Sequence, residues 1–149
     1  MSKPIHILNG PNLNRLGTRE PEIYGRATLA DIEAMCRAEA GPTPLVFRQS
    51  NPEYELIEWI HEAIDAGAAG LIVNPAAFTF TSMALMDALK MFPGPLIELH
   101  LSNIHRREPI YHRSYVSPIA TAVIAGLGPR GYPTAVRAMR DLLAGAADA

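Results

Sequence analysis

Two side chains in this 149-residue sequence have neighbours that suit proton transfer. Tyr24 follows Arg19 by five positions in one polar segment, and His100 follows Glu98 by two positions. A free phenol is ionised only about one part in a thousand at pH 7, but a guanidinium within about 4–6 Å favours the phenolate and makes it a usable base. Residues two apart on a strand share a face, so Glu98 could orient or charge His100. The sequence therefore predicts proton-transfer chemistry at Tyr24 and His100.

Other chemistries find less support in the residues present. Lysine occurs at only two positions, neither at the end of a predicted strand, which disfavours Schiff-base catalysis. The serines lack a G-x-S-x-G motif, and there is no Walker-type phosphate loop. His100, His105 and His112 do not have the spacing of a metal site. Residues 126–131 read G-x-G-x-x-G but follow the last predicted strand, so we interpret them as a tight turn. We expect neither a cofactor nor a metal.

Composition limits the compartment and the partners. The formal net charge is −2, which gives no basic surface typical of nucleic-acid binding. Cys36 is the single cysteine, so there is no internal disulfide. No apolar run approaches the roughly 20 residues that span a bilayer, and the first residues lack the apolar stretch of a signal peptide. We expect a cytoplasmic protein with one domain over residues 1–149 and no nucleic-acid or membrane partner.

Five apolar runs alternate with segments of helical length. Near-continuous apolar runs, typical of parallel strands buried on both faces, are Ile5–Leu8, Leu45–Phe47, Gly70–Val73, Pro95–Leu99 and Thr121–Ala125. The predicted helices are Thr28–Ala40, Glu53–Ala66, Thr81–Met91 and Tyr132–Ala147. Thr28 and Asp31 predict a capping box, and Asn51-Pro52 an N-cap with a proline in the first turn. This rhythm predicts an α/β fold, a flavodoxin-like three-layer sandwich whose five-stranded parallel sheet has the order 2-1-3-4-5.

Such a sheet would bring the polar segments together. Ligands of open α/β sheets bind beyond the carboxyl ends of the strands. The segments after the first, third and fourth predicted strands are residues 9–25, 74–82 and 98–117, and they are rich in polar side chains. Loops longer than about 12 residues in compact domains are usually functional or disordered. We therefore expect a polar site at this edge of the sheet.

Several motifs, in this order along nearly the whole chain, resemble those of the type II 3-dehydroquinate dehydratases. They are LNGPNLN at 8–14, REPEIYG at 19–25, RQSN at 48–51, HLSNIH at 100–105 and GLGPRGY at 126–132. The resemblance implies anti elimination of water from 3-dehydroquinate, giving 3-dehydroshikimate through an enolate, in biosynthesis through the shikimate pathway or in quinate catabolism. It also implies that no cofactor or metal is needed and that the chain assembles as a homo-oligomer, a dodecamer of trimers.

The resemblance assigns roles to five residues that would carry the chemistry. Tyr24 would remove the proton from C2, with Arg19 stabilising its phenolate. His100, oriented by Glu98, would protonate the departing C1 hydroxyl. Asn12 would hold a water molecule that stabilises the enolate oxygen.

Further roles concern substrate binding. Asn74, together with Leu101 and Ser102, would bind the substrate's carboxylate and C1 oxygen. Asp87 would reach the site of a neighbouring subunit. The segment 19–24 would close over the substrate as a lid that excludes water.

The chain departs from the family pattern at positions that would recognise ring hydroxyls. Phe80 stands where the family usually has His, Tyr111 where it usually has Arg, and Met86 where Arg usually precedes Asp87. A site that hydrogen-bonds a hydroxyl discriminates strongly, and apolar replacements lose that discrimination. We therefore hypothesise that the elimination chemistry is retained, while affinity for 3-dehydroquinate is weaker or other ring substituents are preferred. Restoring both Phe80→His and Tyr111→Arg should then lower KM.

Three other interpretations stay open. One is the same elimination on a related cyclohexanone carboxylate that lacks a ring hydroxyl. A second is a weakly active or non-catalytic paralogue, against which the retained Tyr24 and His100 argue. A third is a flavodoxin-like cofactor or receiver module. A receiver would need acidic residues and a lysine where this chain has Asn9, Asn74 and Gly126, and an FMN module would purify yellow, whereas we expect a colourless protein.

Overall fold

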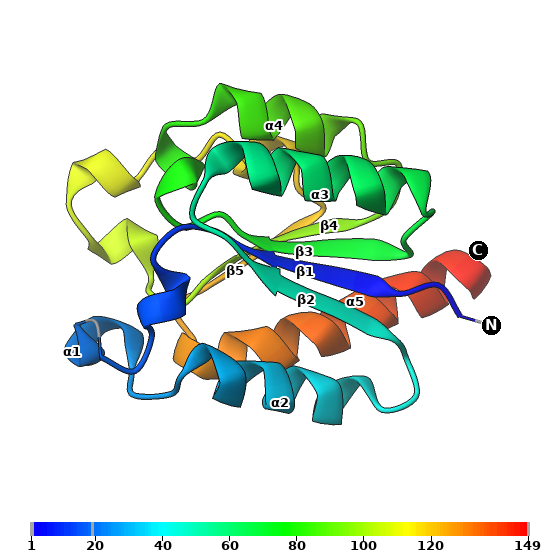
Figure 1. Ribbon diagram of the computed structural model, residues 1–149, viewed down its shortest axis with the longest axis horizontal. Helices are drawn as coiled ribbons and strands as arrows, with labels where there is room; N and C mark the ends of the chain where they lie inside the picture. The colour runs from blue at the N-terminus through cyan, green and yellow to red at the C-terminus, as the bar shows by residue number, and fades with distance from the viewer. Residues whose placement is uncertain (1, 19, 149) are drawn as a thin grey trace.

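The computed structural model describes residues 2–18 and 20–148, and in this part of the chain five parallel strands form one sheet (Figure 1). The sheet has the order β2-β1-β3-β4-β5, with β1 at Ile5–Asn9, β2 at Leu45–Gln49, β3 at Gly70–Asn74, β4 at Leu96–His100 and β5 at Ala122–Ala125. Helices α2 (Leu29–Ala40) and α5 (Gly131–Asp148) cover one face, and α3 (Glu53–Asp65) and α4 (Met83–Lys90) cover the other. The predicted class, layers and strand order are confirmed.

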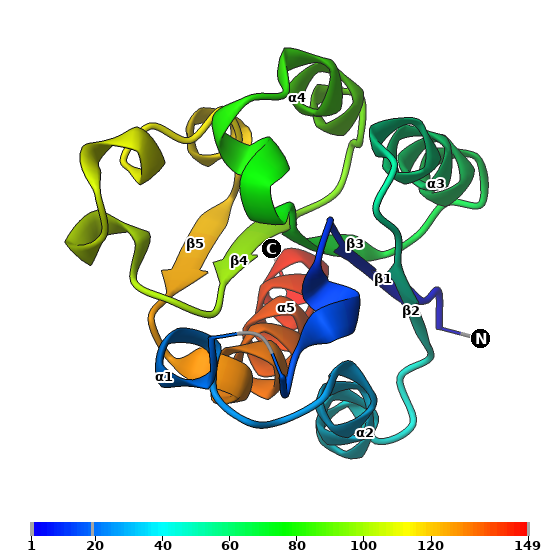
Figure 2. The same cartoon turned by 60° about the vertical axis from the view of Figure 1, so that its left-hand side comes forward.

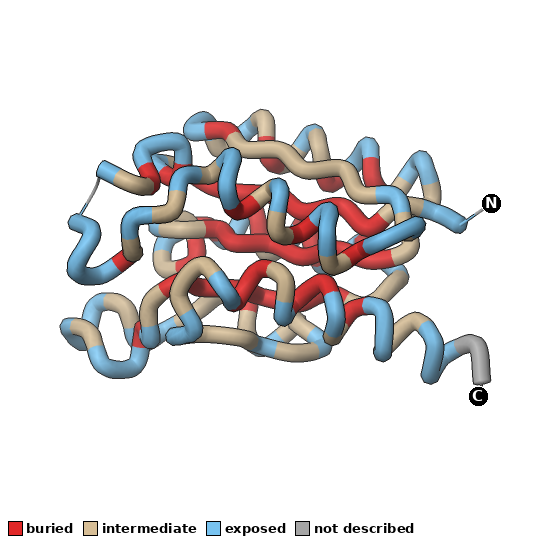
Figure 3. The backbone as a smooth tube through the Cα atoms, turned by 90° about the horizontal axis from the view of Figure 1, so that it is seen from below, coloured by how far each residue is buried: buried red, intermediate tan, exposed pale blue. Residues whose placement is uncertain are grey.

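The central strands are apolar because they are covered on both sides. Every residue of β1, β3 and β4 is buried (Figure 3). Alternate side chains enter two cores: Ile5 and Ile7 pack on the side of α2 and α5, and Leu8 packs on the side of α3 and α4. The register aligns Asn9 with Asn74, so two polar residues meet where these strands end.

Helix boundaries follow the predicted signals with two corrections, of which the first is that α4 begins at Met83, two residues after the predicted Thr81. Thr28 and Asp31 form the predicted capping box, and Ser82 caps α4 by accepting a hydrogen bond from the N–H of Leu85. The prediction that Asn51 caps α3 was wrong, because the capping position is Pro52. The side chain of Asn51 instead accepts hydrogen bonds at the loop after β1, as described below. No helix in the described part of the chain is both long and apolar enough to cross a membrane.

Short helices gather at the carboxyl edge of the sheet (Figure 2). They are α1 (Pro21–Tyr24) and several 3-10 helices, among them Leu13–Arg15, Ala76–Phe80, Ile104–Arg106, Pro109–Tyr111 and Gly128–Arg130. The sequence predicted only loops here, because helices of three to five residues are too short to show a hydrophobic period. They give these segments fixed shapes around the strand ends.

Three glycines lie where these segments come close together. A Cβ at Gly10 would lie 2.4 Å from the carbonyl oxygen of Pro75, so only glycine allows the loops after β1 and β3 to touch. Gly126 has φ +94° and begins the turn expected at 126–131. The N–H groups of Gly126 and Gly128 donate to the carbonyl oxygens of His100 and Leu101, which ties the end of β4 to the loop after β5.

Candidate active site

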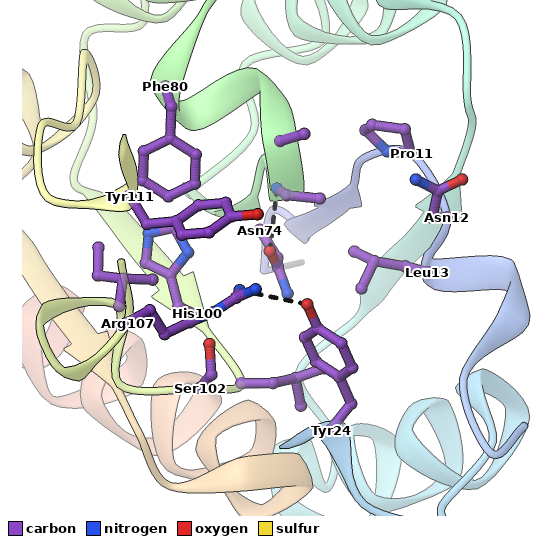
Figure 4. Close-up of a pocket in the computed structure, with 14 residues that line it drawn as sticks. Pro11, Asn12, Leu13, Tyr24, Asn74, Phe80, His100, Ser102, Arg107 and Tyr111 are labelled. Atoms are coloured by element: carbon purple, nitrogen blue, oxygen red, sulfur yellow. Dashed lines mark hydrogen bonds between the residues drawn. The ribbon is translucent and has the colours of Figure 1, made fainter. Parts of the chain in front are cut away.

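A pocket lies at the carboxyl edge of the sheet, where the segments after β1, β3 and β4 meet (Figure 4). It is lined by Pro11, Asn12, Leu13, Tyr24, Asn74, Ala76, Ala77, Phe80, His100, Leu101, Ser102, Ile104, Arg107 and Tyr111. Three chain segments that are far apart in the sequence therefore contribute to one site, as the strand-end rule predicted.

Most of the predicted site residues come together in this pocket. Those that line it are Asn12, Tyr24, Asn74, Phe80, His100, Leu101, Ser102 and Tyr111. Glu98 lies behind His100 and contacts it directly. Asp87 lies on the exposed face of α4 and does not line this pocket. Arg19 lies outside the described residues.

His100 is held by a buried carboxylate. Its Nε2 lies 2.5 Å from Oε2 of Glu98, and because a carboxylate only accepts, the histidine donates this hydrogen bond. Ser114 and Ser117 donate to the same carboxylate through their hydroxyl groups. Burial alone would raise the pKa of Glu98, but the hydrogen bonds from His100, Ser117 and Ser114 hold that pKa below its usual range. The imidazole is therefore fixed in orientation next to a negative charge, and Nδ1 is the nitrogen left for proton exchange.

Tyr24 has a cationic partner that the sequence analysis missed. Nη1 of Arg107 donates a 3.2 Å hydrogen bond to the phenol oxygen (Figure 4). The guanidinium also lies over the ring of Tyr111, 4.0 Å from its centroid. Arg106, Arg107 and Arg113 all follow β4, so their positions in the sequence gave no reason to choose one of them. A guanidinium at this distance can stabilise negative charge on the phenol oxygen.

A buried hydrogen-bond chain fixes Asn74. Its Nδ2 donates to the hydroxyl of Tyr132 at 2.9 Å, and that hydroxyl donates to Oδ1 of Asn9 at 2.7 Å. The N–H of Ala76 donates to Oδ1 of Asn74 at 3.1 Å. Burial raises the pKa of Tyr132 far above its usual value, so its hydroxyl stays protonated. Asn9 and Tyr132 were not predicted from the sequence as supports of Asn74, although Tyr132 stands within the motif at 126–132.

The loop after β1 holds Asn12 in an unusual backbone conformation. Asn12 has φ +70°, and Ala76 in the neighbouring loop after β3 has φ +52°. Such values are strained for residues other than glycine and concentrate at functional sites. The N–H of Asn12 donates to Oδ1 of Asn51 at 2.9 Å, and Gln49 donates to the same oxygen at 3.1 Å. The segment after β2 therefore positions Asn12 rather than entering the pocket.

One wall of the pocket is aromatic. The rings of Phe80 and Tyr111 meet edge to face with centroids 5.2 Å apart, and Phe80 lies 6.2 Å from the ring of His100. This is the wall where the sequence suggested that hydrogen-bonding residues had been replaced. Among the described residues, no three His, Cys, Asp or Glu side chains are placed to hold a metal ion.

Comparison with known proteins places this geometry in context. Residues 3–140 match the model of the class II dehydroquinase family. The chain is 60% identical over 138 residues to 3-dehydroquinate dehydratase 2 of Agrobacterium fabrum, covering 91% of this chain and 93% of the relative. It is 53% identical over 147 residues to the 3-dehydroquinate dehydratase of Methylobacterium radiotolerans, covering 97% and 98%. The crystal structure of the type II dehydroquinase from Propionibacterium acnes is 42% identical, with a TM-score of 0.90 and coverage of 95% and 98%.

Proposed function

The chain belongs to the class II dehydroquinase family, and we propose that its pocket eliminates water from 3-dehydroquinate to give 3-dehydroshikimate through an enolate. It is thus a hydro-lyase, like relatives that are 53–60% identical over nearly the full chain. The main support for the mechanism is that one pocket is lined by the phenol of Tyr24 and by the imidazole of His100, which is hydrogen-bonded to a carboxylate. The two groups can serve as base and acid in the same reaction.

Tyr24 is the base in this proposal. The proton at C2 lies next to the C3 ketone, so its removal leaves a charge that the carbonyl oxygen can accept as an enolate. The hydrogen bond from Arg107 places a positive charge beside the oxygen that must carry a negative charge before it accepts the proton. Arg19 is proposed to act on the same phenol, as the resemblance implies.

His100 is the acid. The C1 hydroxyl is a poor leaving group until it is protonated, and the imidazole supplies that proton from the opposite end of the pocket. Glu98 accepts from Nε2 and stays ionised, so it orients the ring and stabilises the charge of the imidazolium. The serine hydroxyls that bond to Glu98 replace the water that burial removes.

The remaining predicted residues would bind the substrate and its enolate. Asn12 is proposed to hold a water molecule at the enolate oxygen, and its fixed backbone supports that role. Asn74 uses one Nδ2 hydrogen for Tyr132 and has a second one to offer a carboxylate. Leu101 and Ser102 line the same wall and would bind the C1 oxygen or the carboxylate. The segment 19–24, which ends in α1, is proposed to close as a lid.

An assembly belongs to the same proposal. A homododecamer in which Asp87 reaches a neighbouring subunit is supported by the exposure of Asp87 on α4, beside the exposed apolar side chains of Met83 and Met91. The proposal also includes a single domain over residues 1–149 and a cytoplasmic location. Sizing of the protein in solution tests the assembly, and a monomer would contradict a role for Asp87 in a neighbour's site.

The testing experiment is a steady-state assay with 3-dehydroquinate that follows the conjugated enone of the product. Wild-type protein should turn over, and Tyr24→Phe should lose roughly 10²–10⁴-fold in kcat because it has no ionisable hydroxyl. A folded, assembled protein with no turnover would contradict the proposal. Turnover of a cyclohexanone carboxylate that lacks one ring hydroxyl, but not of 3-dehydroquinate, would favour the second candidate, to which the aromatic wall at Phe80 and Tyr111 points.

A further inference from the structure

We infer that Tyr111 is a positioning residue, whose ring holds the guanidinium of Arg107 against the phenol of Tyr24. The inference rests on the proposed function, because it gives Tyr24 the role of base. It differs from the expectation that Tyr111 is a substrate-binding residue at a position where the family usually has Arg. In this proposal the face of the Tyr111 ring holds the guanidinium of Arg107, and the Tyr111 hydroxyl is not needed.

The contacts form a continuous chain across the pocket (Figure 4). The guanidinium carbon of Arg107 lies 4.0 Å from the centroid of the Tyr111 ring, which is a close cation–π contact. The same guanidinium donates a 3.2 Å hydrogen bond to the oxygen of Tyr24. Phe80 packs its edge against Tyr111 at 75°, with centroids 5.2 Å apart, and so limits the rotation of that ring. The carbonyl of Arg107 is also fixed, because His112 Nε2 donates to it at 2.7 Å.

Arg107 is positioned by an aromatic ring rather than by a carboxylate, and this difference affects the charge near Tyr24. No carboxylate among the described residues lies within ion-pair distance of its guanidinium, whereas Arg37 pairs with Glu33 at 2.8 Å and Arg48 with Glu62 at 2.6 Å. A carboxylate would position an arginine but would also offset its charge. The face of an aromatic ring positions the cation and leaves its charge available to stabilise the nearby phenolate.

Other charged groups also lie near Tyr24. His100 lines the same pocket, with Glu98 bonded behind it. On the other side of Tyr24, Glu22 and Arg106 line a neighbouring surface hollow. In the described part of the chain, Tyr111 makes its cation–π contact with Arg107 and with none of these groups, so we expect a substitution at Tyr111 to act on Tyr24 through Arg107.

The test compares Tyr111→Leu, which removes the ring, with Tyr111→Phe, which removes only the hydroxyl. In Tyr111→Leu we expect kcat to fall about tenfold and the acid limb of its pH profile to move up by about one pH unit, since one unit is a tenfold change in the phenolate fraction. Tyr111→Phe should bring the acid limb back to its wild-type position. Ile110→Ala is the matched control, because Ile110 is the preceding residue, is 75% exposed and does not line the pocket.

A second measurement does not depend on turnover. The ultraviolet absorbance of phenolate is titrated in each protein and in the same protein carrying Tyr24→Phe, and the difference gives the ionisation midpoint of Tyr24. The midpoint should rise in Tyr111→Leu and stay unchanged in Ile110→Ala. An unmoved midpoint overturns the inference even if the proposed reaction is correct, and a wild-type protein without turnover would contradict the reaction but leave this titration decisive. A KM that rises equally in Tyr111→Phe and Tyr111→Leu would also overturn it, because it would show a hydroxyl contact with substrate.

Discussion

His100 and its carboxylate partner are two residues apart on one buried strand, whereas Tyr24 lies on a four-residue helix and its arginine comes from another loop. The proposed acid half of the pocket, made by His100, Glu98, Ser114 and Ser117, is therefore positioned by β4 and one segment packed on it. The proposed base half, made by Tyr24, Arg107 and Tyr111, is positioned where separate segments of the chain meet.

This difference has consequences for how each half works. A buried strand holds its side chains with the rigidity of the core, and the hydrogen bonds of Glu98 are complete without substrate. Loop segments have fewer buried contacts and open at lower free energy. The acid half is thus preorganised, while the base half depends on contacts between loops. Such an arrangement suits a site that must admit substrate beside the base.

The largest effect should come from breaking the acid half at Glu98. Glu98→Gln removes the charge next to His100 and can donate a hydrogen bond where the carboxylate only accepted, so the imidazole loses both its orientation and its stabilisation. We expect kcat to fall by roughly 10²–10⁴. The acid limb of the pH profile should stay in place, because the base half is untouched. Steady-state kinetics across pH measures both.

Glu108→Gln is the matched control for this substitution, since Glu108 is exposed and lies in the segment after β4. Thermal unfolding of each variant shows whether it is folded. A folded Glu98→Gln protein with wild-type kcat would contradict the acid role of the pair. A shift of its acid limb would show that the two halves are not independent.

A smaller effect is expected from the aromatic wall that joins the two halves. Phe80→His and Tyr111→Arg together should lower KM for 3-dehydroquinate, since each restored hydrogen bond is worth roughly two- to tenfold. Tyr111→Arg would also replace the ring that contacts Arg107 with a second cation, which would repel the Arg107 guanidinium. We therefore expect Phe80→His alone to lower KM without loss of kcat, and the double variant to lower KM and kcat together.

The measurement is a set of substrate-saturation curves for both single variants and the double variant. An unchanged KM in the double variant would contradict the hypothesis that hydroxyl recognition was lost at these positions. A double variant with lower KM and full kcat would support substrate recognition but contradict the positioning role of Tyr111.

The fold was predictable to a large extent because its signals are local. Each strand was predicted to within two residues. The three central strands β1, β3 and β4 are buried along their whole length, and such strands are largely apolar in sequence. The capping box at Thr28 was also correct, because it depends on two side chains in one turn. The start of α3 was predicted correctly at Glu53, but its capping residue was not, because Asn51 is a good capping residue whose side chain serves another loop.

The site was predictable only in part. Glu98 and His100 could be paired from their spacing on a strand. Arg107 could not be chosen among neighbouring arginines, because its partner Tyr24 lies 83 residues away. Asn9 and Tyr132 are separated by 123 residues, so nothing local indicates their hydrogen bond. The pairing of residues in the proposed acid half could thus be predicted from the sequence, whereas the pairing of Tyr24 with Arg107 in the proposed base half was found only in the tertiary structure.

The smallest effect concerns a buried histidine that lacks the support given to His100. His6 on β1 has no hydrogen-bond partner for Nδ1 among the described residues. Burial lowers the pKa of His6, the positive charge of Arg48 lowers it further, and Glu62 partly opposes both. The histidine therefore stays neutral in the folded protein at a pH where the unfolded chain already binds a proton.

The sign of the effect on stability follows from that difference. Because the pKa of His6 in the folded state is lower than in the unfolded state, its contribution is complete above the unfolded value of about 6.5 and is lost as pH falls towards the folded value, at no more than about 1.4 kcal/mol per pH unit. The free energy of unfolding, measured with denaturant between about pH 7.5 and about pH 5, should fall less steeply with decreasing pH in His6→Leu than in wild type. His61→Gln, at an exposed position on α3, is the control and should behave as wild type. Equal slopes for His6→Leu and wild type would show that the folded protein accommodates the proton. A buried histidine would then not need a carboxylate such as Glu98 to carry a charge, and the preorganisation argued for the acid half would have to rest on orientation alone.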